Sequence, residues 1–177
     1  MIPSISINHL LTLLLTIFTL TPTPATASWE CGEYRDNKEE SSAISPKWRD
    51  CLQLRANINN GGTWKFISGT QTTLASYLTC AIGVDSAEGN WAGTWVKVGH
   101  QDIINIVEMM EKMILEKNDP NQVVQDKKTG KAVSVKPDAR VGGRGSMKCY
   151  QYVLRWEMMK VYWGVYHYCP KGPKMYC

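Results

Sequence analysis

Two histidines, His100 and His167, are the strongest candidates for acid–base chemistry in this sequence. Together they could act as acid and base, with Arg144 as a phosphate clamp, in the manner of a two-histidine ribonuclease. A Ser-His-Asp hydrolase has no marker, because the chain contains no GxSxG motif. We expect His100 to be a half-exposed residue capping a helix, and His167 to be packed and hydrogen-bonded on a strand. Nothing here requires an enzyme, and we expect no catalytic residues.

Other catalytic and binding chemistries also lack a marker. A glycosidase needs two converging carboxylates, but the candidates stand singly and mostly on predicted solvated faces: Asp50, Asp85, Glu88, Asp102, Glu108 and Glu157. The two histidines lie outside any metal-ligand spacing, so we expect neither a metal nor a cofactor. The glycine-rich run 140–149 matches neither GxxxxGK[ST] nor GxGxxG, and we expect it to serve close backbone packing instead of phosphate binding.

The cysteines predict a disulfide framework. All six lie after the first thirty residues and none forms a Cys-x-x-Cys pair: Cys31, Cys51, Cys80, Cys149, Cys169 and Cys177. An even count in an exported chain indicates three bridges, but six cysteines allow fifteen pairings. A Cys51–Cys80 bridge would attach the first helix to the second strand and stabilise the fold by roughly 3 kcal/mol. A Cys169–Cys177 bridge would close the tail.

Residues 1–27 are predicted to be a secretory signal peptide. They contain no charged side chain and carry an apolar run from Leu10 to Leu20, followed by the small-x-small cleavage site Ala25-Thr26-Ala27. The run is shorter than the roughly 20 residues that a membrane span needs, and we expect no transmembrane segment. Residues 28–177 should then form a single secreted, extracellular domain of about 150 residues.

The net charge and the aromatic residues of the chain indicate which kinds of molecule it could bind. The net charge of +4 is spread as Lys and Arg among Asp and Glu, which does not indicate a nucleic-acid binder. Trp48, Trp64 and Trp163 fall on predicted buried faces. Trp91 and Trp95 remain candidates for surface aromatics that could stack on a carbohydrate. We expect the protein to be a monomer.

Periodicity predicts an α+β fold, a two-layer sandwich in which an antiparallel sheet carries two helices on one face. The first helix should start at Ser45-Pro46 and bury Trp48, Cys51, Leu52 and Ala56. The second should span 101–117 and bury Ile103, Val107, Met110 and Ile114. Strands are expected at 63–67, 73–84, 91–98 as hairpin partner of 73–84, and 160–168 with 151–159 as its neighbour. Residues 122–135 form a predicted charged hairpin with a solvated basic tip.

Six segments taken in order resemble the fungal necrosis-inducing effector family, whose founder is an extracellular protein of a leaf pathogen. They are Asp50-Cys51, Gly62-Thr63-Trp64, Ser76 to Val84, Val98 to Ile104, Arg140 to Cys149 and Trp163 to Tyr166. The resemblance implies a secreted virulence effector without enzymatic activity, acting in the host apoplast, with a fold similar to fungal killer toxins. It also implies that Cys31, Cys51, Cys80 and Cys149 form framework disulfides.

This chain departs from the family pattern at several positions. His100 replaces an expected Asn, Leu78 stands where Gly is usual, and the hairpin around 127–136 looks like an insertion. A changed loop and tail could direct the protein to another host or competitor cell-surface target. Four functions therefore stay open: a necrosis-inducing effector, a killer-toxin-like antimicrobial protein, a small secreted ribonuclease-like hydrolase and a glycan-binding module.

Overall fold

The computed structural model describes residues 30–69, 71–86, 93–151 and 158–168, which form two helices and nine strands. The expected signal peptide, Trp91, Cys169 and Cys177 lie outside these residues. The helices are α2 (Trp48–Ile58) and α3 (His100–Lys117). The strands are β1 (Cys31–Glu39), β2 (Thr63–Ile67), β3 (Thr72–Tyr77), β4 (Cys80–Ser86), β5 (Trp95–Gly99), β6 (Val123–Gln125), β7 (Ala132–Val135), β8 (Gly143–Tyr150) and β9 (Met158–His167).

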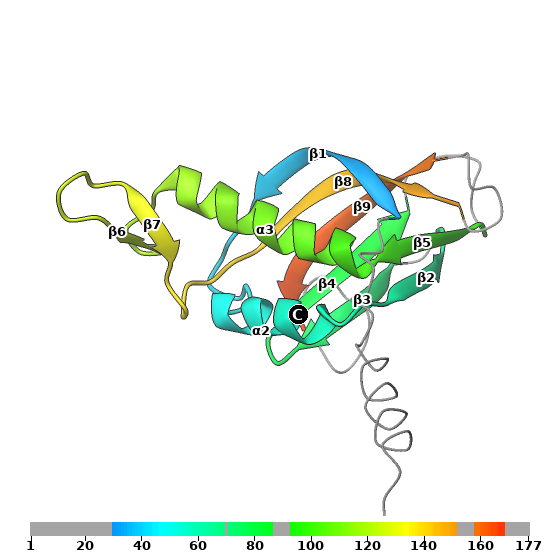
Figure 1. Ribbon diagram of the computed structural model, residues 1–177, viewed down its shortest axis with the longest axis horizontal. Coiled ribbons are helices and arrows are strands. Elements are labelled where there is room, and N and C mark those ends of the chain that lie inside the picture. The colour runs from blue at the N-terminus through cyan, green and yellow to red at the C-terminus, as the bar shows by residue number, and fades with distance from the viewer. Residues whose placement is uncertain (1–29, 70, 87–92, 152–157, 169–177) are drawn as a thin grey trace, which may run out of the picture.

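Five of the strands form one antiparallel sheet in the order β1-β8-β9-β4-β3. Figure 1 shows both helices in front of this sheet, with α3 lying across β8 and β9 and α2 next to the start of β4. The predicted α+β fold with both helices on one face is therefore confirmed. The described strands divide among three sheets, because β2 pairs with β5 and β6 pairs with β7 in two small ribbons.

The centre of the large sheet is packed around β9, as its apolar residues on both faces predict. Val161, Trp163 and Val165 of β9 are buried beneath the helices. The adjacent strand β8 approaches closely because it has glycine at two positions. A Cβ atom on Gly145 would lie 2.6 Å from the indole of Trp163, and one on Gly143 would lie 2.5 Å from the Met110 sulfur. The glycine-rich run thus serves close packing, as expected.

Two disulfides join the layers and the sheet edge. Cys31–Cys149 links the edge strand β1 to β8, and Cys51–Cys80 links α2 to β4. The second is the pairing considered from the sequence. Both pairs use the four cysteines to which the family resemblance assigned a framework role.

The predicted single strand 73–84 is wrong, because the chain reverses direction in the middle of it. Leu78 adopts the left-handed conformation with φ 46°, and the turn separates β3 from β4. Asp50 of α2 holds this turn, since its carboxylate accepts hydrogen bonds from the backbone N–H (3.2 Å) and the hydroxyl of Thr79. The alternating pattern of the sequence continues through residues 77–80, so it gave no sign of the turn.

Two predicted strand pairings are also wrong. The strand that ends near Val98 is β5, and it pairs with β2, with Trp64 opposite Val98, instead of forming a hairpin with the segment 73–84. The neighbours of β9 are β8 and β4, and Met158 and Met159 of the segment expected beside it belong to β9 itself, while residues 152–157 lie outside the described residues. Pairings between strands far apart in the chain depend on tertiary packing, which local patterns do not encode.

The structure agrees with the predicted α3 more closely than with the predicted α2. The four residues expected to be buried on α3 are buried, and Asn118 ends the helix in the left-handed conformation. Helix α2 begins at Trp48 with Lys47 as its N-cap, not at Ser45, because the Ser45 hydroxyl accepts a hydrogen bond from the Ser42 N–H (2.9 Å). On α2 Leu54 is buried, whereas Leu52 is only half-buried and Ala56 is exposed.

A fully buried carboxylate, that of Asp102, ties three elements together at the start of α3. Its Oδ2 accepts hydrogen bonds from the backbone N–H groups of Glu30 (3.0 Å), Cys31 (3.1 Å) and Gly99 (2.8 Å), and its Oδ1 accepts one from the Tyr34 hydroxyl (3.1 Å). Burial raises the pKa of Asp102, and these four donors act in the opposite direction. Burial and the neighbouring Asp102 charge both raise the pKa of Tyr34.

Replacing Asp102 by Ala should lower the free energy of unfolding by about 3 kcal/mol, because two buried backbone donors and one partly buried donor lose their acceptor. Asp126→Ala is the control: its carboxylate also accepts backbone N–H groups, but in an exposed hairpin where water can replace it. Urea unfolding of both variants measures the difference. Equal losses would show that burial of the Asp102 network adds nothing.

Replacing Gly145 by Ala should destabilise the domain by about 1–3 kcal/mol, because the added methyl group overpacks against Trp163. Gly32→Ala is the matched control on the neighbouring strand, where a Cβ would meet nothing within 4 Å. Its effect should stay within about 0.5 kcal/mol. Thermal unfolding followed by tryptophan fluorescence checks both, and a harmless Gly145→Ala would contradict the close packing of β8 against β9.

Candidate functional site

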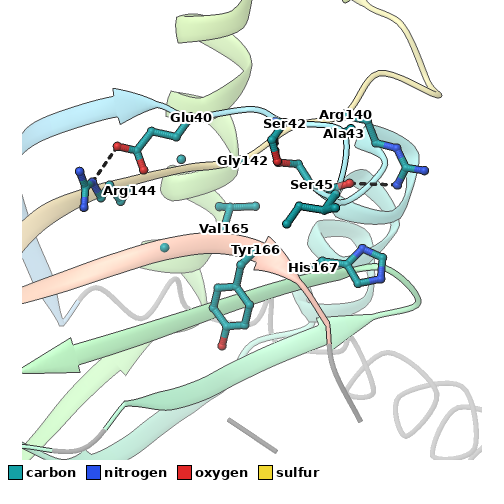
Figure 2. A pocket seen from close by; sticks show the side chains of 13 residues that line it. Glu40, Ser42, Ala43, Ser45, Arg140, Gly142, Arg144, Val165, Tyr166 and His167 are labelled. Carbon is teal, nitrogen blue, oxygen red and sulfur yellow. Dashed lines mark hydrogen bonds and ion pairs between the residues drawn. The ribbon is translucent and has the colours of Figure 1, made fainter. Parts of the chain in front are cut away.

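A pocket of about 350 Å³ opens between the end of β9 and the segment that follows β1 (Figure 2). Three stretches of chain line it: residues from 40–45, from 140–144 and from 164–167. Only tertiary folding brings them together, since β8 and β9 pair side by side and Glu40 N–H donates to the Gly142 carbonyl (2.8 Å).

Two guanidinium groups line the pocket, and each has one partner. Arg144 Nε lies 2.9 Å from a carboxylate oxygen of Glu40, and the Arg140 guanidinium donates to the Ser45 carbonyl (2.9 Å). Figure 2 shows both contacts as dashed lines. The Arg144 side chain is 59% exposed, and exposed ion pairs contribute only about 0–1 kcal/mol. Arg144 can therefore exchange Glu40 for an anionic ligand at little cost.

Besides Glu40, Arg140, Arg144 and His167, the polar side chains of the pocket are neutral hydroxyls already engaged in hydrogen bonds. The buried Ser45 Oγ lies 3.1 Å from the Ser42 hydroxyl. The Tyr166 hydroxyl lies 2.6 Å from that of Thr73, and burial raises the pKa of Tyr166. Among the lining residues that the structure describes, Glu40 is the sole carboxylate. The arrangement suits binding of a small polar or anionic group, and it does not provide the carboxylate pair of a glycosidase.

The structure brings together only two of the three residues considered for acid–base chemistry. His167 is half-buried and lines the pocket together with Arg144. His100 begins α3 beside β5, whereas β9 ends beside α2 (Figure 1). His100 is only 3% exposed, so the expectation of a half-exposed cap was wrong: its N–H donates to the Gly62 carbonyl (2.9 Å), which lies against the start of α3.

The described carboxylates and tryptophans that the sequence suggested as site residues do not gather at one place either. Asp50 and Asp102 are buried structural acceptors, which corrects the expectation of solvated faces for these two. Glu108 lies 3.9 Å from Arg55, while Glu88 and Glu157 lie outside the described residues. Trp95 is 45% exposed, as considered possible for a surface aromatic. Trp48 and Trp163 are buried, as expected, whereas Trp64 is only half-buried.

Sequence reasoning missed most of the pocket. Glu40 carried no motif, whereas Arg140 and Tyr166 lay in segments that were interpreted through close packing or the family resemblance and not as parts of a site. No group of three or more potential metal ligands occurs among the residues that the structure describes. Arg144 was identified, but as a phosphate clamp for a histidine pair that does not assemble.

Comparison with known proteins gives one family match. Residues 30–149 match the Hce2 family, described as "pathogen effector; putative necrosis-inducing factor". This range contains both disulfides and more than half of the chain. No curated protein was found to match. Within the described ranges, no helix has the length and apolarity needed to cross a membrane. The chain therefore belongs to the Hce2 family of pathogen effectors.

Proposed function

We propose that the protein is secreted and acts as a non-enzymatic effector that provokes cell death from outside the target cell. The observation that carries this proposal is the family match over residues 30–149, which contains both disulfides of the described chain. The target would be a molecule on the surface of a host or competitor cell.

Two further observations support action outside the cell. Disulfides form and persist in oxidising compartments, and Cys31–Cys149 and Cys51–Cys80 join the sheet edge and the helix layer of this fold. The uncharged, apolar leader 1–27 has the features of a signal peptide. On this proposal, the active species is the folded, oxidised chain from Ser28 onward.

Infiltration of purified, oxidised 28–177 protein into leaves should produce cell death, whereas the same protein after reduction and alkylation should not. The reason is that removing native disulfides from a small secreted domain typically costs about 2–5 kcal/mol each, enough to unfold it. Circular dichroism of both samples verifies the folded state before infiltration.

Two outcomes would contradict this proposal. Equal cell death from the alkylated sample would assign the activity to a linear segment instead of the fold. No response on several plant species would favour toxicity toward competing fungi or glycan binding. Growth inhibition of fungi and retention on chitin, where the exposed Trp95 could stack on sugar rings, would separate those two functions.

The absence of enzymatic chemistry is tested by replacing His100 and His167 with Gln, which keeps much of the side-chain volume but cannot transfer protons at neutral pH. We expect the double variant to cause cell death within about twofold of the native dose response, since a positioned acid or base is worth about 10²–10⁴ in rate. A loss of that size in a folded double variant would support a hydrolase. Each single variant identifies which histidine is responsible.

A further inference from the structure

The β6–β7 hairpin stands apart from the sheet at the end of α3. Figure 1 shows it beyond the C-terminal end of that helix, at the left of the molecule. Its inner side is apolar, because the cross-strand pair Val123 and Val135 is buried. The Asn118 amide donates to the Gly130 carbonyl (3.1 Å), and Lys136 N–H donates to the Gln122 carbonyl (2.8 Å). The hairpin is therefore a firmly attached projection of the domain.

The tip of the hairpin, residues 126–131, is a closed turn that directs its charge outward. The Asp126 carboxylate accepts hydrogen bonds from the backbone N–H groups of Lys128 (3.0 Å) and Thr129 (2.7 Å). These bonds lower the pKa of Asp126 and engage its oxygens inside the turn. Lys127, Lys128 and Lys131 are exposed around it.

These three lysines differ from most cations of the fold. In the part of the chain that the structure describes, none of the three forms an ion pair. By contrast, Lys117 lies 2.6 Å from Glu39 and Lys148 lies 2.9 Å from Glu33. The tip therefore carries three lysines and one carboxylate, that of Asp126, whose oxygens are engaged inside the turn, so positive charge is in excess there.

The strands beside this charge expose apolar side chains. Val124 of β6 is 45% exposed and Val133 of β7 is 59% exposed. The exposed valines lie on the two strands directly behind the lysines, so this end of the molecule presents both cations and methyl groups to solvent. Such a surface matches a bilayer interface, where anionic headgroups lie next to hydrocarbon. An anionic polysaccharide would complement the lysines but would leave the valines in water.

We propose that the β6–β7 hairpin docks the protein on the anionic lipid bilayer of its target cell. The lysines at the tip contact the lipid headgroups, and Val124 and Val133 enter the interfacial region. Each lysine near an anionic surface strengthens binding about fivefold, so three give a reversible, salt-sensitive attachment. At the base of the hairpin, the Gln122 side chain donates to the Arg140 carbonyl (3.1 Å), which connects the docking element to the rim of the pocket.

The test uses the oxidised 28–177 protein and sedimentation with lipid vesicles. We expect binding to vesicles that contain phosphatidylserine, loss of binding in high salt, and no binding to pure phosphatidylcholine. Lys127→Glu/Lys128→Glu/Lys131→Glu should lower the partition coefficient by at least about 100-fold. Val124→Ser/Val133→Ser should lower it several-fold and leave its salt dependence unchanged, since the charges remain.

The matched control is Lys38→Glu/Lys65→Glu/Lys112→Glu, which changes the net charge equally at exposed positions on β1, β2 and α3. It should retain most of the binding. Equal losses in the two triple variants would overturn the proposal in favour of a general charge effect. Absence of vesicle binding, or hairpin-dependent binding to polygalacturonate alone, would also overturn it. Vesicle binding is measured without cells, so its outcome is separate from that of the cell-death assay.

Discussion

The buried Asp102 carboxylate is the interaction on which the rest of the domain depends. It joins the first residues of the edge strand β1 to the end of β5 and the start of α3, by accepting from Glu30, Cys31 and Gly99. Cys31, held by this network, is bonded to Cys149 of β8. The orientation of α3 over the sheet and the covalent closure of the sheet edge therefore meet at one point, where an unmade hydrogen bond would be costly.

Close packing between α3 and the sheet then fixes the positions of the elements farther from Asp102. Gly143 and Gly145 allow β8 to contact Met110 and Trp163, which sets the height of α3 above the sheet. Helix α3 then presents the β6–β7 hairpin at its C-terminal end (Figure 1). The start of β8 and the end of β9 line the pocket. The same packing therefore positions both the pocket and the hairpin.

The pocket and the hairpin differ in whether their cationic side chains already have partners. The pocket presents donors that already have partners, such as Arg144 with Glu40 at 2.9 Å. The hairpin tip instead presents lysines without carboxylate partners in the described chain. A protein that attaches by the hairpin would hold the rim at Arg140 in a defined orientation, because Gln122 connects the two. This arrangement is compatible with an effector that acts by recognition at a cell surface.

The sequence alone determined the class of fold, the helix α3, the strand β2 and the hairpin, because each rests on local periodicity or on turn residues. The four framework cysteines followed from the family resemblance. The pairing of β5 with β2, the turn at Leu78 and the burial of His100 were decided by tertiary structure. The pocket was decided in the same way, since Glu40, Arg140 and Tyr166 come from distant segments. The physical reason is that contacts between remote segments depend on how whole layers pack, and no local pattern records that packing.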